Sequence, residues 1–274
     1  MSVVSNSAPR NRKAWEERLI RAQELQEQHP NAAPLLRFYE EVLKFQMELA
    51  SEFKAEVQAG LSIREQIDTN IAMRTFPTLL ALANQSGTEA LRLRAGALLK
   101  AGEQSWRSIL ESALANHPQA DQPDANFVDI FFARACLQPA AENLQLQLPK
   151  DRTYGQSICP ACEGLPQMSV LRPEGEGAGK WLLCSFCLAE WPFRRIACPS
   201  CGEEDREKLP RYSAAEYPYV YVEACDRCKQ YLKTVDLTLD GRAVPVVDEM
   251  ALAVLDVWAS DHGYTKIMQN LAGF

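Results

Sequence analysis

Apolar residues in the first half of the chain recur at the spacing of amphipathic helices. Residues 35–53 form one apolar stripe with a period near 3.6, after Asn31 as a candidate N-cap and Pro34 in the first turn. Residues 12–28 are rich in helix-forming side chains. We therefore expect a helical bundle over residues 1–150. Further helices are predicted over 77–84, 88–101, 103–115 and 126–137.

The pattern changes near Pro149, after which short β-rich segments follow. The glycine-rich residues 174–179 suit a hairpin turn between the first two segments. Helical spacing returns over 246–270, with a break expected at His262 and Gly263. The predicted strands cover 168–172, 180–183, 219–223 and 232–239. The expected units are a helical domain (1–150), two β modules (151–195 and 196–240) and a C-terminal helix (241–274), an α+β multidomain fold.

Eight of the nine cysteines fall into four Cys-x-x-Cys pairs in the second half of the chain. A two-residue gap lets both sulfurs of a pair face one point, and a second such pair completes a tetrahedral thiolate site. We therefore predict two metal ions, each in a site of four cysteines. Their ligands are Cys159, Cys162, Cys184 and Cys187 in the first site and Cys198, Cys201, Cys225 and Cys228 in the second.

Two ways of pairing the four motifs are open. In the sequential arrangement adjacent pairs share a metal, whereas in the interleaved arrangement the first pair joins the third. The segments of 21 and 23 residues between adjacent pairs each accommodate one hairpin, but only ten residues separate Cys187 from Cys198. The spacing favours the sequential arrangement, in which each module is a rubredoxin-like or zinc-ribbon unit.

Sulfur ligands alone do not decide between zinc and iron, since both metals accept tetrahedral thiolates. In rubredoxin-type Cys-x-x-Cys turns, here called knuckles, the residue after the second cysteine takes a positive φ angle that favours glycine. Gly202 fits this rule. The other three positions hold Glu163, Leu188 and Lys229, so the metal stays open. Closed four-ligand sites are typical of structural staples, and the alternatives are redox use of one site or thiol–disulfide exchange at an unmetallated pair.

Composition restricts the partners and the compartment. The formal net charge is −7, and residues 159–228 contain eight Lys or Arg against eleven Asp or Glu. Nucleic-acid binding relies on cations that neutralise phosphates, so we expect no nucleic-acid partner. No apolar run approaches the roughly 20 residues of a membrane helix, and residues 1–12 lack the apolar stretch of a secretory signal. We expect a cytoplasmic protein without a membrane partner, whose reduced thiols hold metal.

No catalytic or cofactor-binding constellation is evident in the sequence. Aromatic residues cluster around the knuckles, where we expect them mainly to fill two small cores. Trp191, Arg194 and Arg195, on the linker between the modules, are the first candidates for a partner surface, and a solvated turn is the alternative for the two arginines. Cys136 lies on an apolar helix and is expected to be a buried small hydrophobe.

Several stretches resemble the bacterial FdhE family, whose members are accessory proteins for formate dehydrogenase maturation. The pairs 255–256 and 263–264 also fit the final helix of that family. The likeness extends from about residue 10 to the end of the chain, and the cysteine-rich block is its specific part. The stretches are residues 131–139, 159–162, 181–191, 195–201 and 222–234.

The resemblance implies a helical domain followed by two rubredoxin-like modules in a cytoplasmic protein that is not an enzyme. It implies contact with the catalytic subunit of a molybdenum- or tungsten-containing formate dehydrogenase before that subunit is exported or assembled. Iron has been associated with the family, which favours a redox-sensitive site. By motif match the eight paired cysteines carry over as metal ligands, and no partner contact carries over. Rival functions are a rubredoxin-like iron redox protein and a zinc-ribbon nucleic-acid binder; the oligomeric state stays open, a homo-oligomer included.

Overall fold

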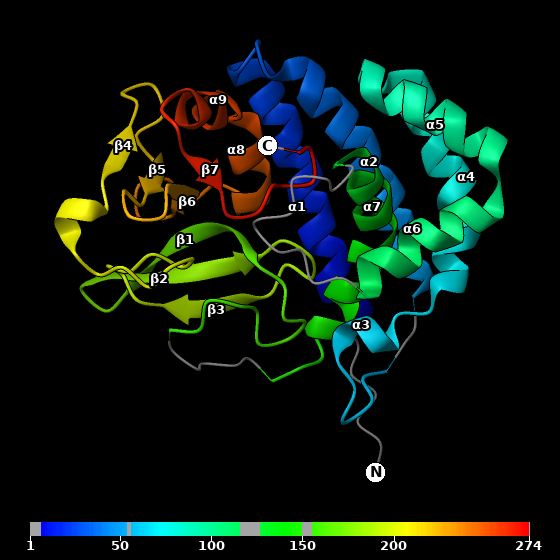
Figure 1. Cartoon of the computed structure of the whole chain (residues 1–274), viewed down its shortest axis with the longest axis horizontal. Coiled ribbons are helices and arrows are strands. Elements are labelled where there is room, and N and C mark those ends of the chain that lie inside the picture. Colours follow the sequence, from blue (N-terminus) through cyan, green and yellow to red (C-terminus); the bar gives the residue numbers. More distant parts are fainter. Residues whose placement is uncertain (1–6, 54–55, 116–126, 150–154, 274) are drawn as a thin grey trace.

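A computed structural model describes residues 7–53, 56–115, 127–149 and 155–273, with only the backbone for residues 7–11. The expected helix start at Asn126 and the expected boundary between residues 150 and 151 lie outside this part. Helices occupy the first half of the chain and strands dominate the second, as the hydrophobic pattern predicts (Figure 1). The fold is α+β: a helical bundle, two cysteine-rich modules and a terminal helical segment.

Three helices of the bundle, at residues 63–66, 69–86 and 89–101, begin at capping side chains. Asp68 Oδ1 accepts a hydrogen bond from the N–H of Asn70 at 2.9 Å, and Thr88 caps the following helix in the same way. Of the helices in the described residues, none is both long and apolar enough to cross a bilayer. The helices of the first half are α1 (Ser7–Gln28), α2 (Ala33–Glu52), α3 (Ile63–Gln66), α4 (Thr69–Ser86), α5 (Glu89–Ala101), α6 (Glu103–Ala115) and α7 (Phe127–Gln145).

The strands of the described residues form one sheet in the order β3-β2-β1-β6-β5-β4, with β7 beside β6. Each module contributes an antiparallel hairpin, β1–β2 in the first and β5–β6 in the second. The parallel pairing of β1 with β6 joins the two hairpins. The strands are β1 (Pro166–Glu174), β2 (Gly177–Cys184), β3 (Glu190–Phe193), β4 (Arg211–Ser213), β5 (Val220–Ala224), β6 (Gln230–Asp236) and β7 (Thr265–Lys266).

The two modules therefore share a continuous sheet, and their division at residues 195 and 196 stays a prediction. The terminal segment contains two short helices, α8 (Pro245–Ala251) and α9 (Val254–Asp261). The expected break at His262 and Gly263 ends the helical segment, with Gly263 at φ 81°. The residues that follow form β7 and loops, so the helical spacing up to Asn270 does not correspond to helix.

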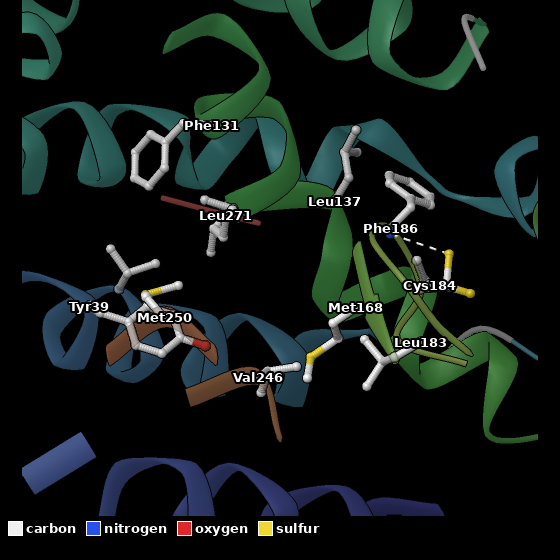
Figure 2. Close-up of a cluster of buried hydrophobic side chains, with 14 of the residues drawn as sticks. Tyr39, Phe131, Leu137, Met168, Leu183, Cys184, Phe186, Val246, Met250 and Leu271 are labelled. Atoms are coloured by element: carbon white, nitrogen blue, oxygen red, sulfur yellow. Dashed lines mark hydrogen bonds between the residues drawn. The ribbon is translucent and has the colours of Figure 1, made fainter. Parts of the chain in front are cut away.

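The hydrophobic core runs from the bundle into the first module. Figure 2 shows Leu137 of α7 near Phe186, and Met168 of β1 near Leu183 of β2, with Val246 and Met250 of α8 in the same cluster. Burial of side chains of this size is worth about 1.5–3 kcal/mol each. This shared core therefore fixes the first hairpin and α8 against the bundle.

A buried ionic network attaches the terminal segment to the sheet. Lys233 of β6 is fully buried, and its Nζ lies 3.0 Å from Glu249 Oε1 of α8 and 2.5 Å from Asp256 Oδ2 of α9. Lys266 of β7 forms ion pairs with the same two carboxylates. Buried charges are tolerated when each faces an opposite charge, as the two lysines and two carboxylates do here.

Candidate metal centres

All four knuckles have the same backbone turn. In each knuckle the residue after the second cysteine has a positive φ angle. Three of these four residues are not glycine, and among the described residues they are the only non-glycine residues with a positive φ angle. The φ angles are 59° at Glu163, 58° at Leu188, 73° at Gly202 and 57° at Lys229. The N–H of each first cysteine also donates to the carbonyl five residues later, at 2.8–2.9 Å: Cys159 to Gly164, Cys184 to Ala189, Cys198 to Glu203 and Cys225 to Gln230.

The structure groups the thiols sequentially, as the spacing favours. Within each group the Sγ atoms all lie within 4.8 Å of one another. A tetrahedral zinc site with Zn–S bonds of about 2.3 Å has sulfur–sulfur edges of about 3.8 Å. The shortest Sγ–Sγ distances are 3.6 Å (Cys159–Cys187), 3.4 Å (Cys162–Cys184), 3.7 Å (Cys198–Cys228) and 3.6 Å (Cys201–Cys225). Both groups therefore fit the dimensions of a tetrathiolate metal ion.

The first cluster is fully buried, and Arg64 of α3 reaches it from the bundle. Arg64 Nε donates to the carbonyl of Cys162 at 3.1 Å, Nη1 donates to the carbonyl of Ala113 at 2.6 Å, and the guanidinium stacks over the ring of Phe186 at 4.2 Å. Arg64 Nη2 is buried without a hydrogen-bond partner. A tetrathiolate ion carries a net charge of about −2, which would face this N–H group.

Gly164 lies so close to the first cluster that a side chain would crowd the sulfur atoms. A Cβ at this position would lie 3.1 Å from Cys184 Sγ, 3.3 Å from Cys162 Sγ and 3.8 Å from Arg64 Nη2. Its φ angle is ordinary, so the need for glycine comes from space. The unpartnered Arg64 nitrogen and the two sulfur atoms therefore all lie around the same glycine.

Helix α7 holds the second knuckle of the first cluster. The guanidinium of Arg134 donates to the carbonyl of Ser185, which lies between Cys184 and Cys187, and Gln138 Nε2 donates to the same oxygen at 3.2 Å. Burial lowers the pKa of Arg134 to about 10. Both side chains belong to the conspicuous stretch at residues 131–139. Cys136 in that stretch is fully buried, as expected.

The second cluster lies nearer the surface. Cys198 and Cys225 are buried, whereas Cys201 and Cys228 are half-buried. The charged residues beside it are exposed or partly exposed. Among them, Glu203 Oε2 lies 3.7 Å from Arg227 Nη1 and 3.9 Å from Lys208 Nζ. The two clusters are thus unequal in environment although their knuckles are alike.

Without a bound cation, four thiols packed together in a buried site cannot all ionise. Burial raises the pKa of Cys187, and hydrogen bonding to Cys159 raises that of Cys162. Burial by itself would raise the pKa of Cys184 too, but hydrogen bonds from the other three thiols bring it well below its usual range. Ionisation of Cys184 is thus favoured over that of Cys162 and Cys187, and a divalent cation is the charge that would allow all four thiols to ionise.

The prediction that Trp191 belongs to a partner surface on the linker is wrong. This side chain is fully buried in β3, and its Nε1 donates to the carbonyl of Gln156 at 2.8 Å. Arg194 is exposed and forms an ion pair with Glu204, while Arg195 donates to the carbonyl of Ala178. The sequence pattern did not distinguish strand β3 from a linker. Because side chains alternate between the two faces of a strand, Trp191 of β3 points into the core.

Comparisons with known proteins extend over nearly the whole chain. Protein FdhE homolog of Aquifex aeolicus is 26% identical over 267 residues, which cover 91% of this chain and 92% of that protein. The crystal structure of the FdhE protein from Pseudomonas aeruginosa superposes with a TM-score of 0.72 at 25% identity and covers 95% of this chain and 96% of that one. The family models of the FdhE central domain and FdhE C-terminal domain match residues 158–195 and 196–272. The chain is thus similar to FdhE proteins over nearly its whole length, and residues 158–272 match the two FdhE family models.

A shorter match to another FdhE protein has higher identity. Protein FdhE homolog of Pseudomonas aeruginosa is 32% identical over 150 residues, which cover 51% of this chain and 48% of that protein. The two family models together begin at residue 158, one position before Cys159, and include all eight paired cysteines. The cysteine-rich part is therefore where both family models match, as the sequence resemblance indicates.

Proposed function

We propose that this protein is a non-enzymatic accessory protein for formate dehydrogenase maturation in the cytoplasm. The resemblance to FdhE proteins supports this role, because it implies an accessory protein for formate dehydrogenase maturation. The observation that carries the proposal is the agreement over nearly the full length, in sequence and in fold, with FdhE proteins. The second support is a pair of four-cysteine clusters in the part of the chain that both FdhE family models match.

The eight paired cysteines would hold two metal ions, zinc or iron. Cys159, Cys162, Cys184 and Cys187 form one closed set of donors, and Cys198, Cys201, Cys225 and Cys228 form the other. A closed set of four thiolates leaves no position for substrate, so the ions would supply folding energy and rigidity. The protein itself orients the donors through the four knuckles and, at the first cluster, through Arg64 and Arg134.

The client in this proposal is the catalytic subunit of formate dehydrogenase, bound through the metal-stabilised modules. A tagged full-length chain, loaded with metal and kept without oxygen, is mixed at low salt with a native lysate containing that enzyme. We expect recovery of the catalytic subunit, and a lower recovery with the Cys198→Ser/Cys201→Ser variant, whose second module lacks half of its ligands. Failure of the unmodified chain to recover the subunit would count against the client, whatever its metal content.

The half-buried Cys201 and Cys228 favour one rival, a rubredoxin-like iron redox protein, because electron transfer requires a centre near the surface. Anaerobic preparation, metal-to-protein stoichiometry and an absorption spectrum separate the two functions. Iron sites would give a red protein that bleaches reversibly on reduction. A colourless protein with zinc alone excludes the redox function and leaves the accessory role intact.

A further inference from the structure

A cavity of about 430 Å³ lies on the face of the sheet turned away from the bundle. Met168 of β1 packs toward the bundle, and because side chains alternate along a strand, Leu171 points to the opposite face. Leu171, its pairing partner Lys180 and the paired Glu223 and Leu232 line the cavity. The floor therefore comes from both modules at the point where β1 joins β6.

Apart from Cys198 and Cys225 of the second cluster, the charged side chains that line this cavity carry a net positive charge, in a chain with a net charge of −7. Arg195, Arg206 and Arg211 line it together with Lys180, and Glu223 is the only carboxylate among the described lining residues. Glu223 is already committed, since its Oε2 lies 2.6 Å from Lys180 Nζ and accepts from Thr234 Oγ1 at 2.6 Å. Three guanidinium groups therefore remain without a carboxylate of the cavity.

The arginines at the rim are free to meet a ligand. Within the described residues, Arg206 and Arg211 have no carboxylate at ion-pair distance, and Arg195 uses one N–H group on the carbonyl of Ala178 at 2.9 Å. The guanidinium of Arg211 stacks over the ring of Tyr221, 3.1 Å from its centroid, which fixes the plane of its donors. An ordered guanidinium presents two parallel N–H groups to a carboxylate or phosphate.

Gln230 and several apolar side chains complete the wall of the cavity. Gln230 lines the cavity and is 9% exposed, and its Oε1 is buried without a hydrogen bond. The remaining walls include Leu209, Ile196 and Ile267, which provide an apolar surface.

We propose that this inter-module cavity binds a small organic anion, in which a phosphate or carboxylate group pairs with Arg206 and Arg211 and an apolar body fills the space beside Leu171 and Leu232. Its volume is within the range of small-molecule sites. Because the floor belongs to both modules, an occupant bridges them beside the second cluster. The proposal does not depend on the formate dehydrogenase role.

The test uses the metal-loaded full-length chain and two probes that chelate metal weakly, phenyl phosphate and benzoate. Isothermal titration calorimetry should show saturable binding of at least one probe with a Kd of about 1 mM or below. Arg206→Gln/Arg211→Gln should weaken it at least about tenfold. The matched control is Arg37→Gln/Arg92→Gln, which removes the same charge from exposed positions on α2 and α5 and should leave the Kd unchanged.

The two probes distinguish the anionic group, since stronger binding of one identifies a phosphate or a carboxylate ligand. Metal content measured after each titration shows that the probe has not removed the ions. Absence of saturable binding by both probes would overturn the proposal. So would equal weakening by the two double variants, because that result would indicate a general charge effect and no site.

Discussion

Arg64 on α3 donates a hydrogen bond from Nε to the carbonyl oxygen of Cys162, 3.1 Å away and 98 residues later in the chain. Nη1 of the same guanidinium binds the carbonyl of Ala113 at the end of α6. One side chain thus connects two helices of the bundle to the first metal centre. The first cluster is therefore a joint between the bundle and the sheet as well as a staple within its own module.

Replacement of Arg64 by alanine should destabilise the protein by about 3 kcal/mol. The change removes two hydrogen bonds from a charged donor to buried carbonyl groups and the stacking on Phe186. Urea unfolding of the metal-loaded chain measures the effect. Arg92→Ala, at an exposed position of α5, is the control and should stay within about 0.5 kcal/mol of the unmodified chain. Equal stability of the two variants would show that Arg64 does not join the parts.

Replacement of Gly164 by alanine should weaken metal binding at the first centre. The added Cβ would lie 3.1 Å from Cys184 Sγ, so either the knuckle or the sulfur must move, at a cost of about 1–3 kcal/mol. Competition with a chromophoric chelator measures the affinity of each site. Gly241→Ala is the control, because its Cβ meets only the carbonyl of Leu237 at 3.8 Å. An unchanged affinity at the first site would contradict the close approach.

Gly202 and Gly96 should respond to alanine in opposite directions. Neither added Cβ would meet an atom within 4 Å, so the backbone alone decides the sign. At Gly202, with φ 73°, alanine is strained and should cost about 1 kcal/mol. At Gly96, inside α5, alanine should stabilise the helix by about 0.5–1 kcal/mol. The difference in unfolding free energy between the two variants is the measured quantity; a difference near zero would refute the backbone argument.

The sequence was sufficient for the α+β class and for the grouping of the thiols, because helical spacing and Cys-x-x-Cys pairs are local signals. It was wrong about where two helices begin. Helix α4 was expected to begin at Pro77, but the Asp68 cap begins it at Thr69 and the proline is accommodated inside. Helix α2 follows Ala32 without a side-chain cap, so Asn31 is not used as expected.

The surroundings of the first centre could not be read from the chain. Helix α3 has four residues, too few to show a helical period, and nothing near Arg64 indicates a contact 98 residues away. Arg134 lies in a stretch that stood out by resemblance, yet its target Ser185 appears only once the chain is folded. The parallel pairing of β1 with β6 is likewise a long-range feature.

Acidification from pH 8 to pH 5.5 should weaken the fold slightly through His29. Burial lowers the pKa of this imidazole below 6.5, with Arg21 acting in the same direction and Asp248 opposing, and its ring packs edge-on against Tyr217 at 5.4 Å. The unfolded state then binds more protons in the interval just below pH 6.5, so stability is lost as the pH falls through that value. His29→Gln should show a smaller loss between the same two pH values, measured by urea unfolding. Identical losses would exclude His29 as the source.

Loss of the two metal centres should have unequal consequences. Cys159→Ser/Cys162→Ser and Cys198→Ser/Cys201→Ser each remove half of one donor set, so each variant should retain one ion per chain in place of two. The first variant should be the less stable, because its cluster is fully buried and is held by α3 and α7.

Hydrogen exchange shows whether the first metal centre connects the bundle to the sheet or stabilises its own module alone. In the first variant, the amides of α7 near Arg134 should exchange faster, since the carbonyl of Ser185 is no longer held in place for Arg134 and Gln138. In the second variant the same amides should keep their protection, because that cluster has no contact with α7 among the hydrogen bonds of the described residues. Equal protection of α7 in both variants would mean that the first ion stabilises its own module alone and that the bundle is held by apolar packing.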